Sequence, residues 1–385
     1  MVSRITLVAA ASMLLGAAMT PAKAADLGKG GVSDLEDRVA ELEATVARKG
    51  NRVVTLQLYG TVAKGLLIWD DGNDSDAYVV DNDAITTILG FKGEAQINPG
   101  LKAGYKIELG VSDSSSAGVS ATDDEGDGGA TLSIRQNNVY IESSTYGRFT
   151  IGQQSTASDG AAEISLANTL IVANPDHTPN FDVVNGRGTV QQYAADFDGG
   201  RDDLIRYDSP SVYGFILSAA WGDDNYYDVA LRFAKEFNSV KVAAGIAYAK
   251  AEDDNVTSDL GTYEQVVGSI SVMHVPTGLF ANFAAGQRDN EDTDVEGSFY
   301  FAQAGIERKF FSYGATTLYG EYGNYEDITF EGTSAELWGL GVVQHIDAAA
   351  MDLYAQARFW SFEDDALAGD PEDVSSLMIG AKIDF

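Results

Sequence analysis

Several side chains in this sequence could perform chemistry, but their spacing matches no reaction centre. The chain has no cysteine, which excludes disulfides and thiolate chemistry. Its three histidines, His177, His274 and His345, are scattered and have no acid or hydroxyl residue at the spacing of a catalytic motif. We therefore expect that the protein is not an enzyme and that it uses no cofactor.

The acidic residues raise the possibility of a metal site. Residues 123–128 weakly resemble the first half of a calcium-binding loop, but the twelfth position is Ile134, where such a loop needs a glutamate. Most other acids stand in short runs, such as Asp70-Asp71 and Glu363-Asp364-Asp365, which are typical of solvated loops. We expect no dedicated metal site, although loose binding of divalent cations among external acids is consistent with these runs.

The charge balance restricts the possible partners. The formal net charge is −33, and it becomes −35 if Arg4 and Lys23 are removed with a signal peptide. Contacts to phosphates need a basic surface, so we expect no nucleic-acid partner.

The end of the chain carries the clearest structural signal. From Val374 to Phe385 every second residue is apolar, and the residues between them are mostly polar. A period of two is typical of a β-strand with two different faces. An uncovered apolar strand at a sheet edge invites aggregation, and closed barrels avoid this by pairing the last strand with the first.

The alternation recurs from residue 53 onwards and predicts a barrel over 53–385. Seven tight turns alternate with eight longer connections, among them 70–83, which predicts sixteen strands. A soluble β-sandwich would alternate too. The regular alternation of short and long connections disfavours it, as do aromatics placed near strand ends like an interfacial girdle, namely Trp69, Trp221, Tyr248, Tyr322 and Trp360. We expect an all-β fold, a 16-stranded antiparallel transmembrane β-barrel.

The first fifty residues differ from the rest. Residues 1–24 have the charged start, apolar stretch and Ala-x-Ala end of a signal peptide, and 25–31 form a glycine-rich linker. Residues 32–50 predict a short helix whose apolar residues follow heptad spacing: Val32, Leu35, Val39, Leu42 and Val46. Two heptads are marginal alone, so we interpret this helix as a trimeric coiled coil, with a single amphipathic helix as the alternative.

Several motifs together resemble the trimeric general-diffusion porins of Gram-negative bacteria. These are Leu89–Glu94 with the following turn, Tyr146–Gln153, Ile205–Pro210 and the terminal Phe385. The segments 34–51 and 69–72 are similar to alphaproteobacterial porins with an N-terminal coiled coil. The resemblance implies a passive pore in the outer membrane, a homotrimer, and a third loop that folds into the lumen.

The resemblance also assigns roles to residues. The longest connection, 155–202, would be the constriction loop, and long loops in compact domains are usually functional. Its acids Asp159, Glu163, Asp176 and Asp182 would face the basic wall residues Arg135, Arg201 and Arg206. Opposed charges at the narrowest point set ion selectivity. Ile88 stands where the family usually places a basic residue, so the basic cluster is thin, and the acidic loops favour cations. Phe385 would be the assembly signal.

We therefore expect an outer-membrane porin for passive diffusion of small hydrophilic solutes, with a preference for cations. Expected partners are two further copies of the chain, outer-membrane lipid and lipopolysaccharide through divalent cations, the barrel assembly machinery, and the cell wall through the coiled coil. The alternatives are a substrate-specific channel, which would need an aromatic track, and an envelope-tethering or adhesin barrel.

Overall fold

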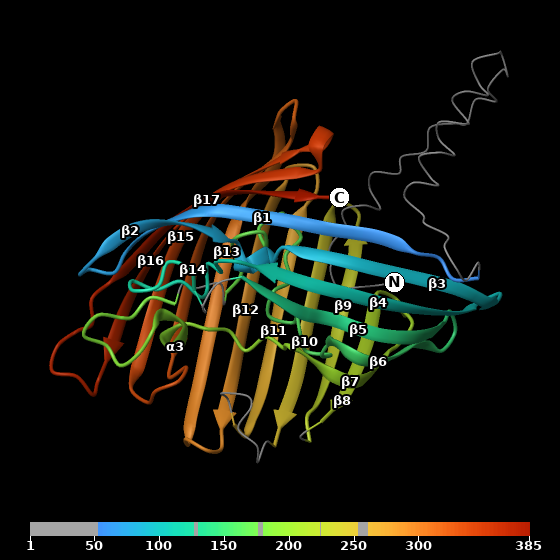
Figure 1. The fold of residues 1–385 in the computed structure, drawn as a ribbon, viewed down its shortest axis with the longest axis horizontal. Coiled ribbons are helices and arrows are strands. Elements are labelled where there is room, and N and C mark those ends of the chain that lie inside the picture. The colour runs from blue at the N-terminus through green and yellow to red at the C-terminus, as the bar shows by residue number, and fades with distance from the viewer. Residues whose placement is uncertain (1–52, 127–129, 176–179, 224, 253–260) are drawn as a thin grey trace.

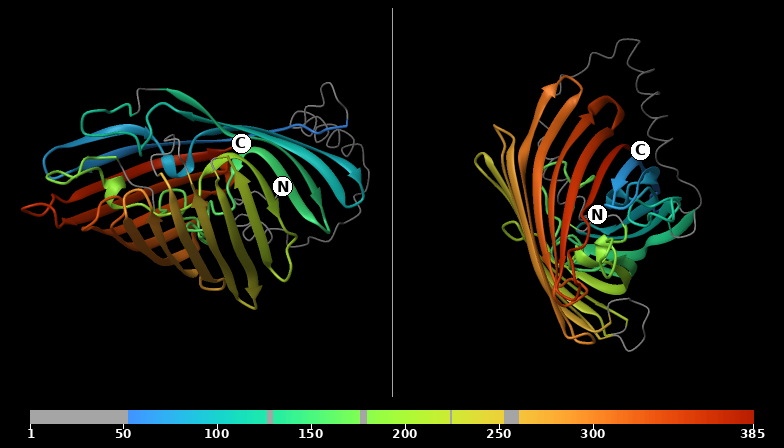
Figure 2. Two further views of the ribbon diagram at one scale, coloured as in Figure 1. Left: turned by 90° about the horizontal axis from the view of Figure 1, so that it is seen from below. Right: turned by 90° about the vertical axis from the view of Figure 1, so that its left-hand side faces the viewer.

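The computed structural model describes residues 53–126, 130–175, 180–223, 225–252 and 261–385. Their strands form one antiparallel sheet that closes on itself. Neighbouring strands in the chain pair with each other, except that β2 and β3 both pair with β1, and β17 also pairs with β1. Figures 1 and 2 show the strands wrapped into a wall around an interior that contains a long loop. The predicted closed barrel is confirmed.

The strands of the wall are seventeen in the described residues. The first nine are β1 (Gln57–Asp70), β2 (Ser75–Asp81), β3 (Ile88–Asn98), β4 (Leu101–Ser112), β5 (Thr131–Ser143), β6 (Gly147–Ser155), β7 (Arg201–Asp208), β8 (Phe215–Gly222) and β9 (Tyr227–Phe237). The others are β10 (Val240–Ala251), β11 (Tyr263–His274), β12 (Leu279–Asn290), β13 (Val295–Phe311), β14 (Gly314–Glu326), β15 (Thr333–Ile346), β16 (Met351–Asp364) and β17 (Val374–Asp384). The helical turns are η1 (Asp83–Ile85), α3 (Val190–Tyr193) and η2 (Asp347–Ala349).

The seventeen strands occupy sixteen positions in the wall, because β2 and β3 share one. The first part of β1 pairs with β3, and its later part pairs with β2. The prediction of a long connection over 70–83 is wrong. The turn between β1 and β2 is short. The aspartates of β2 are typical of a loop, but the segment forms a strand that extends the wall.

The seam between β1 and β17 uses the end of the chain. Thr61 pairs with Asp384 and Asp70 pairs with Ser375, and the backbone of Phe385 exchanges two hydrogen bonds with Gly60. A Cβ atom built on Gly60 would lie 2.4 Å from the Phe385 ring, so only glycine leaves room for it. The last strand is thus the closing strand of the barrel, as the sequence predicts.

The two faces of each strand differ as the alternation predicts. On β1, Val62, Leu66 and Ile68 are exposed on the outside, whereas Leu67 and Trp69 are buried inside. Aromatic rings gather on the outer face, as in the series Tyr300, Tyr322 and Trp338. The prediction of an outer girdle is wrong for Trp69 and Trp360, because both face the interior and are buried. Both belong to the buried apolar cluster that also includes residues of the connection from β6 to β7.

Some predictions fall outside the described residues. The signal peptide (1–24), the linker (25–31) and the helix of 32–50, with Val32, Leu35, Val39, Leu42 and Val46, all lie there. Asp176 of the long loop lies there as well. Among the helices of the described segments, none is both long and apolar enough to cross a membrane.

Candidate pore constriction

The described residues of the connection from β6 to β7, which are 156–175 and 180–200, lie inside the barrel, and we call this connection the inner loop. Its described residues bury an apolar set against the wall, including Ala157, Ile171 and Val172. Two backbone amides of the inner loop donate to serines of β11: Ile164 to Ser269 at 3.1 Å and Leu166 to Ser271 at 2.9 Å. These contacts hold this part of the inner loop against the inner face of β11.

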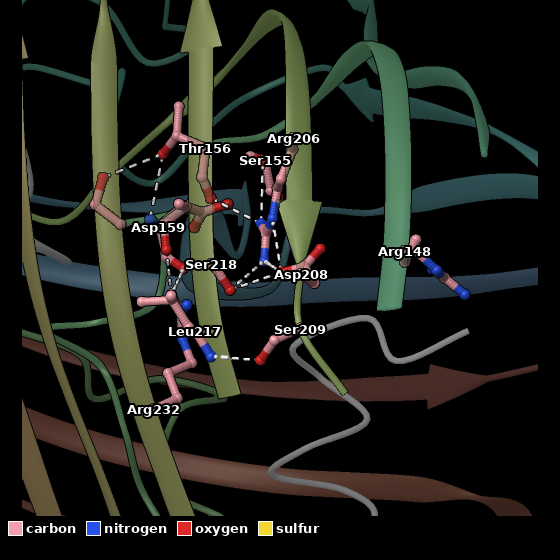
Figure 3. A network of polar contacts seen from close by, with 12 residues as sticks. Arg148, Ser155, Thr156, Asp159, Arg206, Asp208, Ser209, Leu217, Ser218 and Arg232 are labelled. Atoms are coloured by element: carbon pink, nitrogen blue, oxygen red, sulfur yellow. Dashed lines mark hydrogen bonds and ion pairs between the residues drawn. The ribbon is translucent and has the colours of Figure 1, made fainter. Parts of the chain in front are cut away.

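Two arginines hold the beginning of the inner loop (Figure 3). Arg206 on β7 donates to the carbonyls of Ser155 at 3.1 Å and Thr156 at 2.8 Å. Arg232 on β9 donates to the carbonyls of Ala157 at 2.7 Å and Asp159 at 3.0 Å. We call this pair the arginine clamp. A buried Arg that satisfies carbonyls fixes the backbone, because each lost contact would leave a buried acceptor unpaired.

The arginine clamp corrects the role expected of Arg206. The side chain does point inward, as predicted, but it is buried and bound to Asp208 at 2.5 Å as well as to the inner loop. It therefore positions the loop instead of lining open water with a free charge. Next to it, Asp228 accepts from the backbone and hydroxyl of Ser158. Burial raises the pKa of Tyr226 far above that of a free tyrosine, and the Asp228 carboxylate adds to this, so its hydroxyl stays protonated beside Ser158.

The middle of the inner loop is held from the opposite side of the barrel. Asn82, at the break between β2 and β3, donates to the carbonyl of Ile171 at 2.7 Å. Arg358 on β16 donates to the carbonyl of Asn174 at 2.8 Å and pairs with Glu321 on β14 at 2.7 Å. Both partners of this ion pair are buried. The inner loop thus crosses the lumen and is fixed at both walls.

The last part of the inner loop lies near the ends of β1 and β16, two strands that β17 separates. The Phe181 ring stacks on Trp69 with centroids 4.5 Å apart. Arg187 pairs with Asp364 at 2.7 Å, and the Tyr193 hydroxyl donates to the same carboxylate at 2.8 Å. This carboxylate raises the pKa of Arg187 above its ordinary value. These contacts explain why Trp69 is inside and not in the outer girdle.

The predicted charged residues are only partly brought together. Arg135 on β5 lies beside Glu108, at 3.4 Å, and close enough to Arg201 and Asp159 for their charges to act on it. The structure thus places Arg135, Arg201 and Asp159 in one neighbourhood. Glu163 instead accepts from Asn174 at 2.6 Å, and Asp182 is exposed near the far end of the loop, opposite Thr189. The three predicted acids that the structure describes, Asp159, Glu163 and Asp182, do not form a single ring.

Sequence reasoning missed three residues that build this site: Lys106, Arg232 and Arg358. Lys106 on β4 pairs with Glu108 at 2.9 Å, and Tyr59 donates to the same carboxylate at 2.8 Å. All three face inward by strand alternation, which was the available signal. Alternation does not predict the path of the inner loop, and the roles of Arg232 and Arg358 depend on that path.

A closed antiparallel wall with an apolar exterior, around a charged interior narrowed by an inner loop, defines a membrane channel of the β-barrel class. The barrel satisfies its backbone hydrogen bonds within the wall, and the interior keeps polar side chains. The arrangement positions charges along a passage, and the residues that the structure describes include no set of groups arranged for bond-making chemistry.

The comparisons place the chain within this class. The sequence pattern that defines the Gram-negative porin family matches residues 9–365, so the chain belongs to the Gram-negative porins. It is therefore a channel protein of the outer membrane and not an enzyme. No curated protein matches the sequence.

Several solved structures share the fold at low sequence identity. The anion-selective porin from Comamonas acidovorans superposes with a TM-score of 0.61 at 16% identity, over 86% of this chain and 100% of that one. The trimer form of OmpT from Vibrio cholerae gives 0.55 at 16% identity, over 86% and 100%. The outer-membrane channel DcaP of Acinetobacter baumannii gives 0.55 at 15% identity, over 88% and 99%. At these identities the likeness concerns the fold.

Proposed function

We propose that this porin is a passive diffusion channel for small hydrophilic solutes and ions. The observation that carries the proposal is the inner loop. It fills the part of the lumen next to β10–β16 and leaves a polar, charged cavity of about 300 Å³ beside β1 and β3–β7. A passage of this kind excludes large solutes by size and sorts small ones by charge.

Recording from a planar bilayer tests this function. The purified full-length chain should insert in discrete conductance steps that do not saturate as the KCl concentration rises. A substrate-specific channel would instead show a current that one uncharged solute, such as a sugar, blocks to saturation. If no steps occur although the protein is folded, the diffusion proposal fails.

The ion preference follows from two opposing sets of charges. The acids of the whole chain, at a net charge of −33, favour cations at the mouths of the channel. Arg135 and Arg201, together with Asp159 of the inner loop, act at shorter range near the constriction. We propose that the channel prefers cations. The reversal potential in a tenfold KCl gradient gives the sign directly, and a potential of the anion-selective sign contradicts it.

The proposed assembly is a homotrimer tied together by the helix of 32–50. OmpT of Vibrio cholerae, which shares the fold, is described as a trimer. Deletion of 32–49 tests the helix. If it serves assembly, the oligomer should dissociate at a lower temperature in detergent. If it serves an envelope-tethering role, the conductance and the oligomer should persist while attachment to the cell wall is lost. Lipopolysaccharide, through divalent cations, and the barrel assembly machinery, through Phe385, are the further partners that we propose.

A further inference from the structure

The cavity beside β1 and β3–β7 carries an excess of basic side chains, although the protein as a whole is acidic. The charged residues that line it are Lys92, Lys106, Arg148, Arg206, Glu94 and Asp208. The first four are basic and the last two acidic. The local charge is therefore opposite in sign to that of the chain, which suggests that this part of the passage meets anions.

Two of these lysines form a pair of like charges. Lys92 on β3 and Lys106 on β4 are directly opposite each other in the register of the two strands, and both face the lumen. Their ammonium groups lie 4.8 Å and 5.9 Å from the centroid of the Tyr59 ring. Gly90 makes this position of the ring possible, because a Cβ atom there would lie 2.2 Å from Tyr59 Cζ. Like charges directly opposite on a sheet are unfavourable unless something compensates them.

The compensating charge is incomplete. One buried carboxylate, Glu108, is shared by Lys106, Arg135 and the Tyr59 hydroxyl. The cavity's two arginines have carboxylates of their own, Asp208 for Arg206 and Glu142 for Arg148. Lys92 has no ion pair with any residue that the structure describes, and its ammonium group lies over the Tyr59 ring. Among the described residues, one ammonium group at the cavity wall thus has no carboxylate paired with it.

We infer that this cavity is a transient binding site for small dianions, in which Lys92 and Lys106 together bind a dicarboxylate or a phosphate. Two ammonium groups side by side match two negative charges on one small solute, whereas a monovalent anion engages only one of them. The site is open to water and shares the passage, so binding is weak enough for release, as conduction requires. The inference rests on the proposed channel function.

Planar-bilayer recording with three probes tests the site. Succinate, inorganic phosphate or acetate is added at constant ionic strength to a channel in 0.1 M KCl at neutral pH, where screening is limited. Succinate, phosphate or both should reduce the KCl current with saturation, and acetate should not. Lys92→Met should weaken the block by the dianion about three- to tenfold. This is the loss expected when one unit charge close to the bound anion is removed in a partly aqueous site. Lys92→Gln should do the same, and the Lys92→Met/Lys106→Met double variant should abolish the block.

Lys235 supplies the matched control. It lies on β9, exposed, over the Phe237 ring, so Lys235→Met removes the same charge away from the cavity and should leave the block unchanged. If only one dianion acts, that result identifies the ligand and supports the site. The inference is overturned if a conducting channel shows no block by either dianion, or if the double variant is blocked as strongly as the native chain. A chain that never conducts refutes the proposed function instead.

Discussion

Replacing Arg232 by methionine should loosen the first turn of the inner loop. Arg232 is buried and donates two hydrogen bonds, at 2.7 and 3.0 Å, to the carbonyls of Ala157 and Asp159. A hydrogen bond from a charged group contributes about 1.5–3 kcal/mol. We take the lower value, about 3 kcal/mol for the loss of both, because both come from Nη2 and the substitution also removes Nη1, a buried donor without a partner. Methionine keeps most of the volume and removes the donors, which isolates the effect of the clamp.

The magnitude predicts a measurable change in current. About 3 kcal/mol corresponds to roughly a hundredfold rise in the ratio of released to anchored loop turns. The rest of the inner loop keeps its contacts with Ser269, Ser271 and Arg358, so the barrel itself should fold normally. In single-channel recordings, Arg232→Met should therefore show frequent brief current transitions that the native channel shows rarely. Arg206→Met should do the same, and the double variant should be the noisiest.

The control for this prediction is Arg308→Met. Arg308 is exposed on β13 and has no ion pair with the described residues, so the substitution removes the same charge without touching the loop. Its current should match that of the native channel. The reasoning is refuted if Arg232→Met is as quiet as Arg308→Met while the two variants fold equally well in detergent.

Further predictions concern the seam and the interior ion pair. Gly60→Val should displace the Phe385 ring and lower the temperature at which the barrel unfolds on a heated gel. Gly60→Ala combined with Phe385→Ala should recover only part of the loss of Gly60→Ala alone, because the new Cβ atom would still lie 2.7 Å from the carbonyl oxygen of Ile88. No recovery at all would show that the two positions are not coupled. Removal of Phe385 should reduce the amount of inserted protein in cells and spare the conductance of the pores that form. Glu321→Gln should destabilise the barrel by about 3–5 kcal/mol, because it leaves the buried Arg358 charge without its carboxylate. Glu321→Met/Arg358→Met should be closer to the native melting temperature, and equal losses for the single and double variants would contradict this account.

The wall of the barrel was largely predictable from the sequence, because alternation is a local property of each strand. Val374–Phe385 shows this best, since its faces, its final position and its role in closure all follow from twelve residues. β2 was missed because its aspartates imitate a loop, and its strand character comes from pairing with β1. The local composition of β2 indicates a loop, but its long-range pairing with β1 makes it a strand.

The interior was less predictable, because it depends on the path of one loop. Alternation correctly turns Arg206 inward, but only the course of residues 155–159 makes it a ligand of backbone carbonyls. Trp69 and Trp360 have the composition of girdle residues and are buried inside the barrel, Trp69 under Phe181 of the loop. A loop that packs through backbone carbonyls and small residues such as Ala157 and Ala161 leaves little periodic signal in the sequence.

The conductance of a channel with a shortened inner loop tests the central claim most directly. Replacing residues 161–193 by a short glycine-serine linker removes the contacts with β11, β16 and Trp69 and keeps the arginine clamp at the loop's start. If the inner loop narrows the passage, single-channel conductance should rise severalfold above that of the native chain, and larger neutral solutes should enter. An unchanged conductance from a correctly folded barrel would contradict the claim that this loop sets the width of the pore.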